Sequence, residues 1–551
     1  MKVALADAAR AEGWNAPPAL LAIIGEALQT SGTVRVAIVS RSPEHALAEV
    51  LERAVPDARV TVLPISLAAA DRHIELAARG PMDLIVDLAG GPKARRRFRE
   101  VFFFVRPGGT LVSRLPGEPT LEELVQELQA LRASGELHPP TTARERRTTR
   151  ERDIHALAAS VGRLELRDGF VVVENTVDTV AKVRETEMDR YLEHRPETGA
   201  RIDRIPGVEF DSRCEVRSSA APDSAPDLPD HFEALEMSLR EHSGVTCLPR
   251  QIALQGGVAI PATFRHHAKA RLRNAGLLDW APDFVRRPAY TARPVDGRFF
   301  YLDNRYRGHF GHALTDQISQ LWGWQRAKDR YPDLRALLFD RSGYPFADWE
   351  YTLLEAGGIA RDDVYIATEP IEVETLLVAS QMFSMPDFVH PEIGHTYQSV
   401  GDALEADSGL DACPDRIFCS RRGRRAGNNR DQIEQVFVDA GFEVIYPEDH
   451  PLPDQVRLFR RAEVLAGLAG SGMFQMAFAE HPKHVILVGS ESYSATNEYL
   501  IASVLGHRLD LVLCRPDVPQ VDRFKPAAFH SNFTYDPERE GRFLAAVLED
   551  L

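Results

Sequence analysis

Cysteine is scarce in this sequence, and its spacing excludes two common ways of holding a fold together. The five cysteines among 551 residues, Cys214, Cys247, Cys413, Cys419 and Cys514, are an odd number and form no Cys-x-x-Cys pair. Neither a disulfide framework nor a zinc ribbon is therefore expected, and this usage fits a reducing cytoplasm.

Long apolar runs and an excess of positive charge are also missing. Residues 1–14 carry several charges without the apolar segment of a signal peptide, and no run of about 18 apolar residues occurs, so no spanning helix is expected. The formal net charge of −16 argues against a general nucleic-acid binder. We expect a cytoplasmic protein that could associate peripherally with the inner face of a membrane.

What is present is the composition of a globular protein that is too long for one core. Hydrophobic residues make up 44% and charged residues 26% of the chain, and this length predicts two to four domains. We place a Rossmann-like domain at 1–190, a linker at 191–230, a first α/β lobe at 231–411, a second lobe at 412–535 and a C-terminal helix at 536–551.

The N-terminal domain alternates apolar strands with helices. Strands are predicted at 34–40, 58–64 and 83–88, and helices at 43–54 and 67–79. Continuous apolar runs are typical of strands buried on both faces of a parallel sheet.

This domain resembles the second half of an S-adenosylmethionine-dependent methyltransferase. The resemblance lies in Asp-Leu-Ile-Val-Asp at 83–87 and in the Pro-Gly-Gly turn before a strand at 110–113. The family's Gly-x-Gly turn after the first strand is replaced by Ser-Arg-Ser-Pro-Glu at 40–44. We interpret the domain as non-catalytic, used for docking or acceptor handling, with binding of a nucleotide-like ligand as the alternative. The basic stretch 93–99 is an exposed helix face or a contact for an anionic polymer or lipid headgroup.

The segment 416–490 reads as a complete strand–helix–strand–helix–strand unit. Its first strand ends at Arg421 and Arg422, and a turn of Ala469, Gly470, Ser471 and Gly472 follows a later strand. Ligands of parallel sheets bind beyond the carboxyl ends of the strands. The arginine charge and the N–H groups after Gly470 are both suited to phosphate.

A second motif, Gly-His-Phe-Gly-His-Ala-Leu-Thr-Asp, occupies 308–316 and opens a helix predicted over 313–327. His312 and Asp316 lie four residues apart and share a face of this helix. A histidine and a carboxylate within one turn can tune each other's protonation toward neutral pH.

The order and spacing of the two motifs resemble glycosyltransferase family 61, of the capsular polysaccharide biosynthesis type, over about residues 298–515. Gly311, His312 and Asp316 match its Gly-His-x-x-x-Asp signature. The resemblance implies a GT-B-like pair of Rossmann-like lobes and a transferase that needs no metal. The family's His-Gly-Ala-Gly turn has Ala469 and Ser471 at its His and Ala positions here, so the turn keeps its glycines and loses its imidazole.

The resemblance and the residues together give the candidate site. We predict Asp316 as the general base or its orienting partner and His312 as the other member, against a purely structural pair. The predicted substrate-binding residues are Arg421, Gly470, Ser471, Gly472, Glu448 and His309. Arg421 would bind donor phosphate, against a surface salt bridge, and Glu448 would hold a ribose or sugar hydroxyl. The glycines contact phosphate or only make a tight turn.

The function predicted is an inverting glycosyltransferase that moves a sugar from a nucleotide donor, first of all a UDP-sugar, to a cell-surface polysaccharide or its lipid-linked precursor. No cofactor is required and no nucleic-acid partner is expected. The alternative is a non-catalytic scaffold in a glycan assembly complex, and an active methyltransferase is a third, less favoured hypothesis. The N-terminal domain is a candidate surface for homodimer formation.

Overall fold

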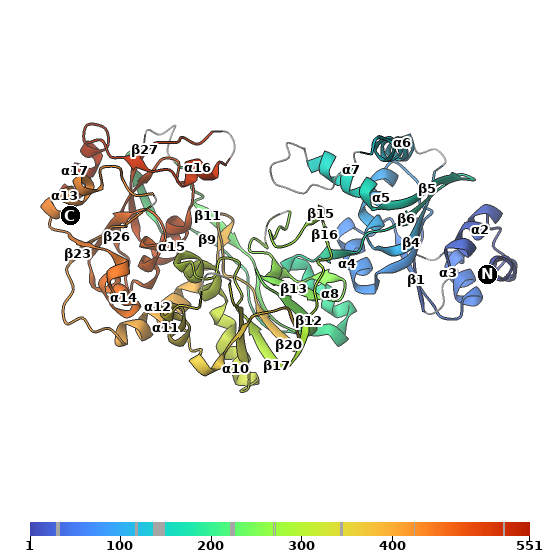
Figure 1. Cartoon of the computed structure of the whole chain (residues 1–551), viewed down its shortest axis with the longest axis horizontal. Coiled ribbons are helices and arrows are strands. Elements are labelled where there is room, and N and C mark those ends of the chain that lie inside the picture. The colour runs from blue at the N-terminus through green and yellow to red at the C-terminus, as the bar shows by residue number, and fades with distance from the viewer. Residues whose placement is uncertain are drawn as a thin grey trace. The chain divides into compact units, whose positions relative to one another are not determined.

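The computed structural model describes residues 1–28, 33–43, 45–115, 119–135, 149–220, 226–267, 269, 271–341, 345–423, 425–521 and 524–551. The chain divides into two compact units, whose elements are labelled in Figure 1. Unit 1 contains Met1–Ala200, His242–Cys247 and Ile252–Ala292. Unit 2 contains Arg201–Glu241, Leu248–Gln251 and Arg293–Leu551.

Unit 1 is built on a six-stranded sheet with the order β2-β1-β3-β4-β6-β5. The first four of these strands run parallel to their neighbours, and β6 is antiparallel to both β4 and β5. The strands are β1 (Val34–Ser40), β2 (Ala58–Pro64), β3 (Met82–Asp87), β4 (Val105–Arg114), β5 (Val161–Arg167) and β6 (Phe170–Asn175). The helices are α1 (Lys2–Ala11), α2 (Pro18–Ala27), α3 (Ala46–Ala54), α4 (Ala69–Arg79), α5 (Ala94–Phe102), α6 (Pro119–Ser134), α7 (Thr149–Ser160) and α8 (Met188–His194).

The central strands of this sheet are buried because their sequences are apolar on both faces. Every residue of β1 except Arg35 is buried, and Ile38 and Leu84 have no exposed surface. The helices α1, α2 and α3 contribute leucine and isoleucine side chains to the same core. The sequence prediction of a parallel α/β domain is therefore confirmed here, with β1 and β2 at the predicted limits.

Unit 1 also contains a smaller group of strands from later in the chain. Their order is β15-β16-β7-β14-β13. These strands are β7 (Thr179–Lys182), β13 (Ile252–Gln255), β14 (Val258–Ala259), β15 (Asp279–Ala281) and β16 (Phe284–Arg286). The N-terminal domain, predicted to end at residue 190, thus extends to Ala200 and takes in two later segments.

The first lobe of unit 2 has the strand order β12-β20-β17-β18-β19, in which β20, β17, β18 and β19 are parallel to their neighbours. The strands are β12 (Met237–Leu248, shared with unit 1), β17 (Arg293–Tyr301), β18 (Arg335–Phe339), β19 (Val364–Ala367) and β20 (Ile371–Ala379). Two short strands, β21 (Phe383–Ser384) and β22 (Phe388–Val389), form a separate pair. Its helices are α9 (Phe310–His312), α10 (Trp324–Arg330), α11 (Asp348–Ala356) and α12 (Ile393–Ala406).

The second lobe has a parallel sheet with the order β10-β27-β26-β25-β23-β24. Its strands are β10 (Glu215–Ser218), β23 (Arg416–Cys419), β24 (Glu443–Ile445), β25 (Val464–Leu468), β26 (His484–Ser490) and β27 (Arg508–Pro516), with β28 (Phe533–Thr534) antiparallel to β27. Its helices are α13 (Arg430–Asp439), α14 (Leu452–Arg461), α15 (Asn497–Leu505), α16 (Pro526–Phe529) and α17 (Gly541–Glu549).

Two boundary predictions need correction. The interval 191–230 is not a plain linker, because it contains β8 (Gly199–Ile205), β9 (Val208–Asp211) and β10, and β9 pairs with β11 (His231–Ala234). The C-terminal helix, predicted at 536–551, covers only Gly541–Glu549, and its Leu544 and Val547 join the core of the second lobe. Residues 221–225 and most of the charged tract 144–152 lie outside the described residues.

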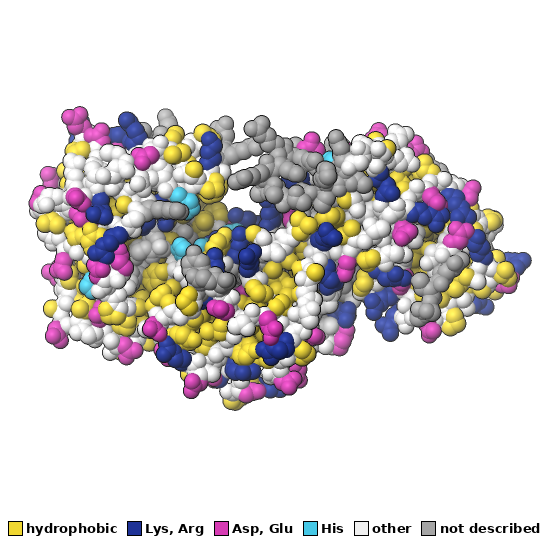
Figure 2. Space-filling view, viewed as in Figure 1, with side chains coloured by type: hydrophobic (Ala, Val, Ile, Leu, Met, Phe, Trp, Pro, Cys, Tyr) yellow, Lys and Arg dark blue, Asp and Glu magenta, His cyan; other side chains and the backbone are white. Residues whose placement is uncertain are grey.

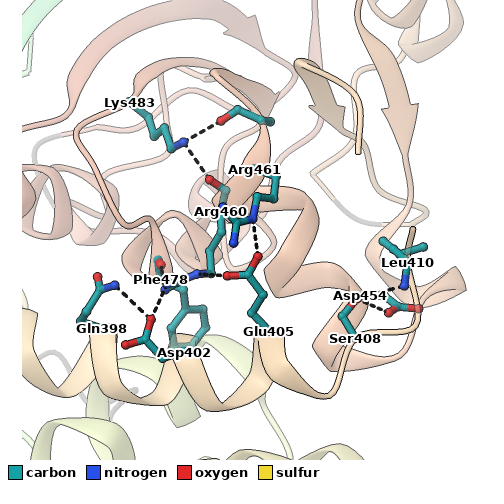
Figure 3. A network of polar contacts seen from close by, with 11 residues as sticks. Gln398, Asp402, Glu405, Ser408, Leu410, Asp454, Arg460, Arg461, Phe478 and Lys483 are labelled. Carbon is teal, nitrogen blue, oxygen red and sulfur yellow. Dashed lines mark hydrogen bonds and ion pairs between the residues drawn. The ribbon is translucent and has the colours of Figure 1, made fainter. Parts of the chain in front are cut away.

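A buried arginine joins the two lobes of unit 2 (Figure 3). Arg460 of α14 donates from Nε to Glu405 Oε2 at 2.9 Å and from Nη1 to the Phe478 carbonyl at 2.7 Å, and it also pairs with Asp402. Both carboxylates lie on α12. A glycine at 401 is needed for this approach, because a Cβ there would lie 2.5 Å from Arg460 Nη1. The lobes therefore share a packed, charge-compensated contact.

The surface is charged and mixed. Figure 2 shows Lys and Arg side chains interspersed with Asp and Glu over the face in view. Within the described ranges, no helix combines the length and the apolar character needed to cross a bilayer. The α/β class with parallel sheets is confirmed, and the specific GT-B arrangement stays a prediction.

Candidate functional site

The histidine motif lies in an irregular helical run of unit 2. The run starts as α9, continues as a π turn over Ala313–Gln317 and a 3₁₀ segment over Ile318–Gly323, and ends as α10. A change of hydrogen-bonding pattern leaves the Asp316 carbonyl to side-chain donors, Ser319 Oγ at 2.9 Å and Gln320 Nε2 at 3.1 Å. Single π turns inside helices are frequent at functional sites.

The π turn brings the two predicted acid–base residues into contact. His312 Nδ1 lies 3.2 Å from Asp316 Oδ2, and Thr315 Oγ1 donates to Asp316 Oδ1 at 3.1 Å. The Asp316 side chain is 3% exposed and that of His312 is 19% exposed. The carboxylate therefore stands behind the imidazole, where it can orient the ring with Nδ1 protonated and leave Nε2 for a proton from outside.

Two neighbouring rings hold His312 in place. Tyr306 stacks on it with ring centroids 4.3 Å apart, and the His309 ring lies 4.7 Å away. Loss of hydration, together with the charges of His312 and Arg425, lowers the pKa of His309 to about 4. His309 is therefore a neutral neighbour of the pair at ordinary pH.

Arg421, which ends β23, lies against the glycine turn. Its Nη2 donates to the carbonyls of Leu468 at 3.0 Å and Ala469 at 2.9 Å. Within the described residues, no carboxylate forms an ion pair with it and its buried Nε has no hydrogen-bond partner. Burial and the nearby Arg425 lower the pKa of Arg421, as expected for a desolvated cation awaiting an anion.

Gly470 makes this arrangement possible without presenting its own N–H to a ligand. Its φ is +134°, and a Cβ at this position would lie 2.6 Å from Arg421 Nη2. Its N–H donates to Glu498 Oε1 at 2.7 Å. The turn leads into a 3₁₀ segment, Met473–Phe478, so the anion site depends on the turn and the arginine more than on a helix dipole.

The two motifs meet across a close glycine contact. A Cβ at Gly311 would lie 2.8 Å from Ser471 Cβ and 3.0 Å from Phe474 Cε2, so a larger residue would force the motifs apart. Beside this contact lies a cavity of about 890 Å³. Gly308 and Phe310 from the first motif and Ser471 and Gly472 from the second line it.

The cavity wall contains four of the eight predicted site residues: Arg421, Glu448, Ser471 and Gly472. His309, His312, Asp316 and Gly470 are outside the wall, the first three in or beside the adjoining helical run. Glu448 is exposed and pairs with Arg422 at 3.4 Å, and Arg422 also binds Asp449 Oδ2 at 2.7 Å. Glu448 therefore belongs to a charged rim.

Three further residues of the site were not predicted. Trp349 of α11 lines the cavity and contacts Phe310 edge to face at 5.5 Å. Gln475 also lines it, with Oε1 buried and unbonded within the described residues. Glu498 is 3% exposed and burial raises the pKa of its carboxyl. Of the three, only Gln475 had a signal in the sequence, because it aligns with a position that is commonly Asn in the glycosyltransferase family that the motifs resemble.

The site offers no obvious metal cage. Among the residues that the structure describes, no three His, Cys, Asp or Glu side chains are grouped to hold a metal ion. Metal independence nevertheless stays a prediction.

Comparison with known families supports the resemblance drawn from the motifs. Residues 310–486 match the model of the family Glycosyltransferase 61. This segment contains every predicted site residue except His309. The match implies a glycosyltransferase. No curated protein sequence matches the chain.

Several solved structures that are similar to part of this chain are methyltransferases. One is the MycE methyltransferase from the mycinamycin biosynthetic pathway in complex with Mg and SAH, at 14% identity, with 31% of this chain and 54% of that chain covered and a TM-score of 0.23. Another is the release factor-specific protein-(glutamine-N5) methyltransferase from Alicyclobacillus acidocaldarius, at 17% identity, with 29% and 94% covered and a TM-score of 0.20. This chain spans about half the length of the MycE structure that it matches.

Proposed function

We propose that this protein is an inverting glycosyltransferase that uses a nucleotide-sugar donor, with the cavity beside Gly311 and Ser471 as its donor site. The observation that carries the proposal is Arg421, a half-buried guanidinium on the cavity wall that, within the described residues, donates hydrogen bonds only to carbonyl oxygens. A nucleoside diphosphate would supply the missing negative charge, because a guanidinium binds phosphate oxygens through two donors.

The donor's other parts have partners in the same wall. Trp349 offers an aromatic face for a base or a sugar ring, and the Ser471–Gly472 turn offers backbone N–H groups to phosphate. Stabilising the leaving diphosphate in this way lowers the barrier to breaking the glycosidic bond. A UDP-sugar remains our first choice of donor.

The acceptor hydroxyl would be activated by the His312–Asp316 pair. With Nδ1 directed at Asp316, Nε2 of His312 accepts the hydroxyl proton as the oxygen attacks the anomeric carbon and the bond to the diphosphate breaks. A single displacement of this kind inverts the anomeric centre. We propose a cell-surface polysaccharide or its lipid-linked precursor as acceptor, met at the inner face of the membrane.

Isothermal titration of the full chain with UDP, GDP, CMP and S-adenosylhomocysteine tests the donor assignment. One nucleoside diphosphate should bind to the native chain and should lose about 100-fold in affinity in Arg421→Ala, since a charged hydrogen-bonding group is removed. Arg293→Ala is the matched control, because Arg293 is exposed, pairs with Glu369 and lies outside the cavity wall. Silence toward every nucleotide by a folded chain would overturn the proposal.

A non-catalytic scaffold is the second candidate, and one observation favours it. The carboxylate of Glu498 occupies the N–H of Gly470, and Ala469 stands where the family usually has histidine. A scaffold would bind glycan or partner without turnover. Nucleotide binding without release of UDP from any UDP-sugar, in the presence of acceptor glycans, would favour it.

A further inference from the structure

A second cavity, of about 600 Å³, lies in unit 1 at the carboxyl ends of its parallel strands. Its wall includes Arg41 after β1, Ile65–Ala69 after β2 and Gly90–Lys93 after β3. The chain moves from β1 to β2 on one side and reaches β3 and β4 on the other, so this is the topological switch point of the sheet. Open α/β sheets bind ligands at such points, and the volume is typical of small-molecule sites.

The wall of this cavity carries a surplus of positive charge. Its cations are Arg41, Arg72, Lys93, Arg96 and Arg97, and Glu100 is the single carboxylate among the described residues of the wall. Arg97 is neutralised by the buried Asp87, with Nε to Oδ2 at 3.0 Å. Glu100 is shared between Arg72 at 2.8 Å and Arg96 at 2.6 Å. One carboxylate therefore serves two arginines, while Arg41 binds only a carbonyl, that of Ala89, at 2.9 Å in the contacts described.

The loop after β3 has the backbone form of an anion cradle. Gly90 and Gly91 have φ of +58° and +89°, and a Cβ at Gly91 would meet nothing within 4 Å. The loop enters α5, a nine-residue helix with no side-chain cap and no acidic residue in its first turn. Within α5 itself, no side-chain cap and no first-turn carboxylate compensate the positive end of the helix.

Arg72 gives an independent indication of an anionic ligand. Arg72 is 6% exposed and lines the cavity. Nη1 donates to the Leu67 carbonyl at 3.1 Å and Nη2 to Glu100 at 2.8 Å, whereas the buried Nε has no partner within the described part of the chain. A buried guanidinium with an unmet donor is costly unless an anion comes close.

We propose that this cavity binds a phosphate group, with the phosphate at the Gly90–Lys93 loop and Arg41, Lys93 and Arg96 around it. The site occupies the position at which a methyltransferase-like sheet would hold S-adenosylmethionine, but Arg41, Lys93 and the positive charge that Glu100 leaves uncompensated on Arg72 and Arg96 disfavour a sulfonium cofactor. On this proposal, the Rossmann-like domain binds an anionic ligand at the end of the sheet where a methyltransferase binds a cationic one. The phosphate belongs to a small phosphorylated molecule or to a lipid headgroup, and this inference does not depend on the proposed transferase activity.

The test uses the full chain carrying Arg421→Ala, so that the cavity of unit 2 does not contribute. Titration with inorganic pyrophosphate should show one site whose affinity falls as salt is raised. Lys93→Ala/Arg96→Ala should weaken it at least about tenfold, because two charge-assisted contacts are lost. Arg10→Ala/Arg95→Ala is the control of equal charge, since Arg95 pairs with Glu127 outside the cavity wall, and should change the affinity less than about twofold.

Two further arms decide the source of the phosphate. Vesicles of phosphatidylglycerol, compared with phosphatidylcholine, report a lipid headgroup, and adenosine monophosphate reports a soluble ligand. Binding in either arm that is lost in Lys93→Ala/Arg96→Ala supports the site and names the source. The proposal is overturned if neither pyrophosphate nor anionic vesicles bind, if the double variant binds as the control does, or if S-adenosylhomocysteine alone binds.

Discussion

Two glycine turns, each after a buried parallel strand, meet opposite surroundings in this protein. The turn after β25 is filled by the chain's own groups: Glu498 takes the Gly470 N–H, and Arg421 lies against the glycine. The loop after β3 is open, because a Cβ at Gly91 would touch nothing. Each cavity nevertheless has in its wall an arginine whose buried Nε lacks a hydrogen-bond partner among the described residues, Arg421 in unit 2 and Arg72 in unit 1.

The difference separates two ways of preparing an anion site. In unit 2, Gly470 leaves room for the Arg421 side chain, so the position of the positive charge is fixed by the packing around Arg421. In unit 1 the glycines shape a bare backbone loop before a nine-residue helix, so charge comes from the helix end and from exposed side chains. We expect a packed site to select one ligand geometry and an open site to be more sensitive to salt.

The largest expected effect concerns the chemistry that only unit 2 is proposed to carry. His312→Ala should reduce kcat by about 10²–10⁴-fold, the usual contribution of a general base. Binding of UDP should change little, because His312 does not line the cavity. Asp316→Asn should lower kcat and shift the acid limb of the pH–rate profile. His395→Ala on the exposed face of α12 is the control, and equal losses in binding and turnover would contradict the assignment.

The next effect tests whether Arg421 acts on the cavity of unit 2 alone. Arg421→Lys keeps the charge and loses both the Nη2 group that donates to the two carbonyls and the planar fork that would bind phosphate, so UDP affinity should fall about tenfold, less than in Arg421→Ala. Binding of pyrophosphate in unit 1 should be unchanged. If Arg421→Lys weakens both, the two cavities are not independent.

A matched pair of glycine substitutions sharpens the contrast between turns. Gly470→Ala places a Cβ 2.6 Å from Arg421 Nη2 in a backbone with φ +134°, and should cost about 1–3 kcal/mol and several-fold in UDP affinity. Gly91→Ala meets no atom, so only backbone strain of about 1 kcal/mol is expected. Urea unfolding and titration measure both, and a larger loss in Gly91→Ala would reverse our interpretation of which turn is packed.

The smallest effect is a pH response. His309 has its pKa lowered to about 4, so it is neutral in the folded chain until the pH falls through that value, and the unfolded chain takes up its proton first. Its contribution to stability is therefore present at neutral pH and is lost as the pH falls from about 6.5 toward 4. His309→Gln should leave the pH–rate profile above pH 5 unchanged, and histidine NMR titration would show directly whether His309 protonates earlier.

Much of the fold was predictable where apolar periodicity is strong. The strands β1 and β2 fall at their predicted limits, and β1 does so because burial on both faces gives it a continuous apolar run. Strands of three or four residues in unit 1, such as β7 and β16, carry no such run and were missed. The linker prediction failed because β10 is stabilised by pairing with β27, nearly 300 residues later, which composition does not report.

The candidate site was predictable as residue types and only partly as geometry. The spacing of His312 and Asp316 predicted their contact, and Arg421 and the glycine turn do lie together. Glu498 was missed, since it precedes no motif and acts through the Gly470 N–H. The sequence also did not show which of the two residues is more deeply buried. Because Asp316 is the more buried one, it is the orienting member of the pair and His312 is the outward one.

The π turn at Ala313–Gln317 has a consequence for how such a helix is read. A π turn holds one residue more than an α turn. Compared with an uninterrupted α-helix, the residues before the π turn are therefore rotated by about 100° relative to the residues after it. Ile318, Leu321 and Trp324 can thus face the core while His312 faces outward. Deleting one residue there would keep a helix and misdirect the imidazole, so in relatives an apparent gap at this place would mark a changed phase rather than a lost segment.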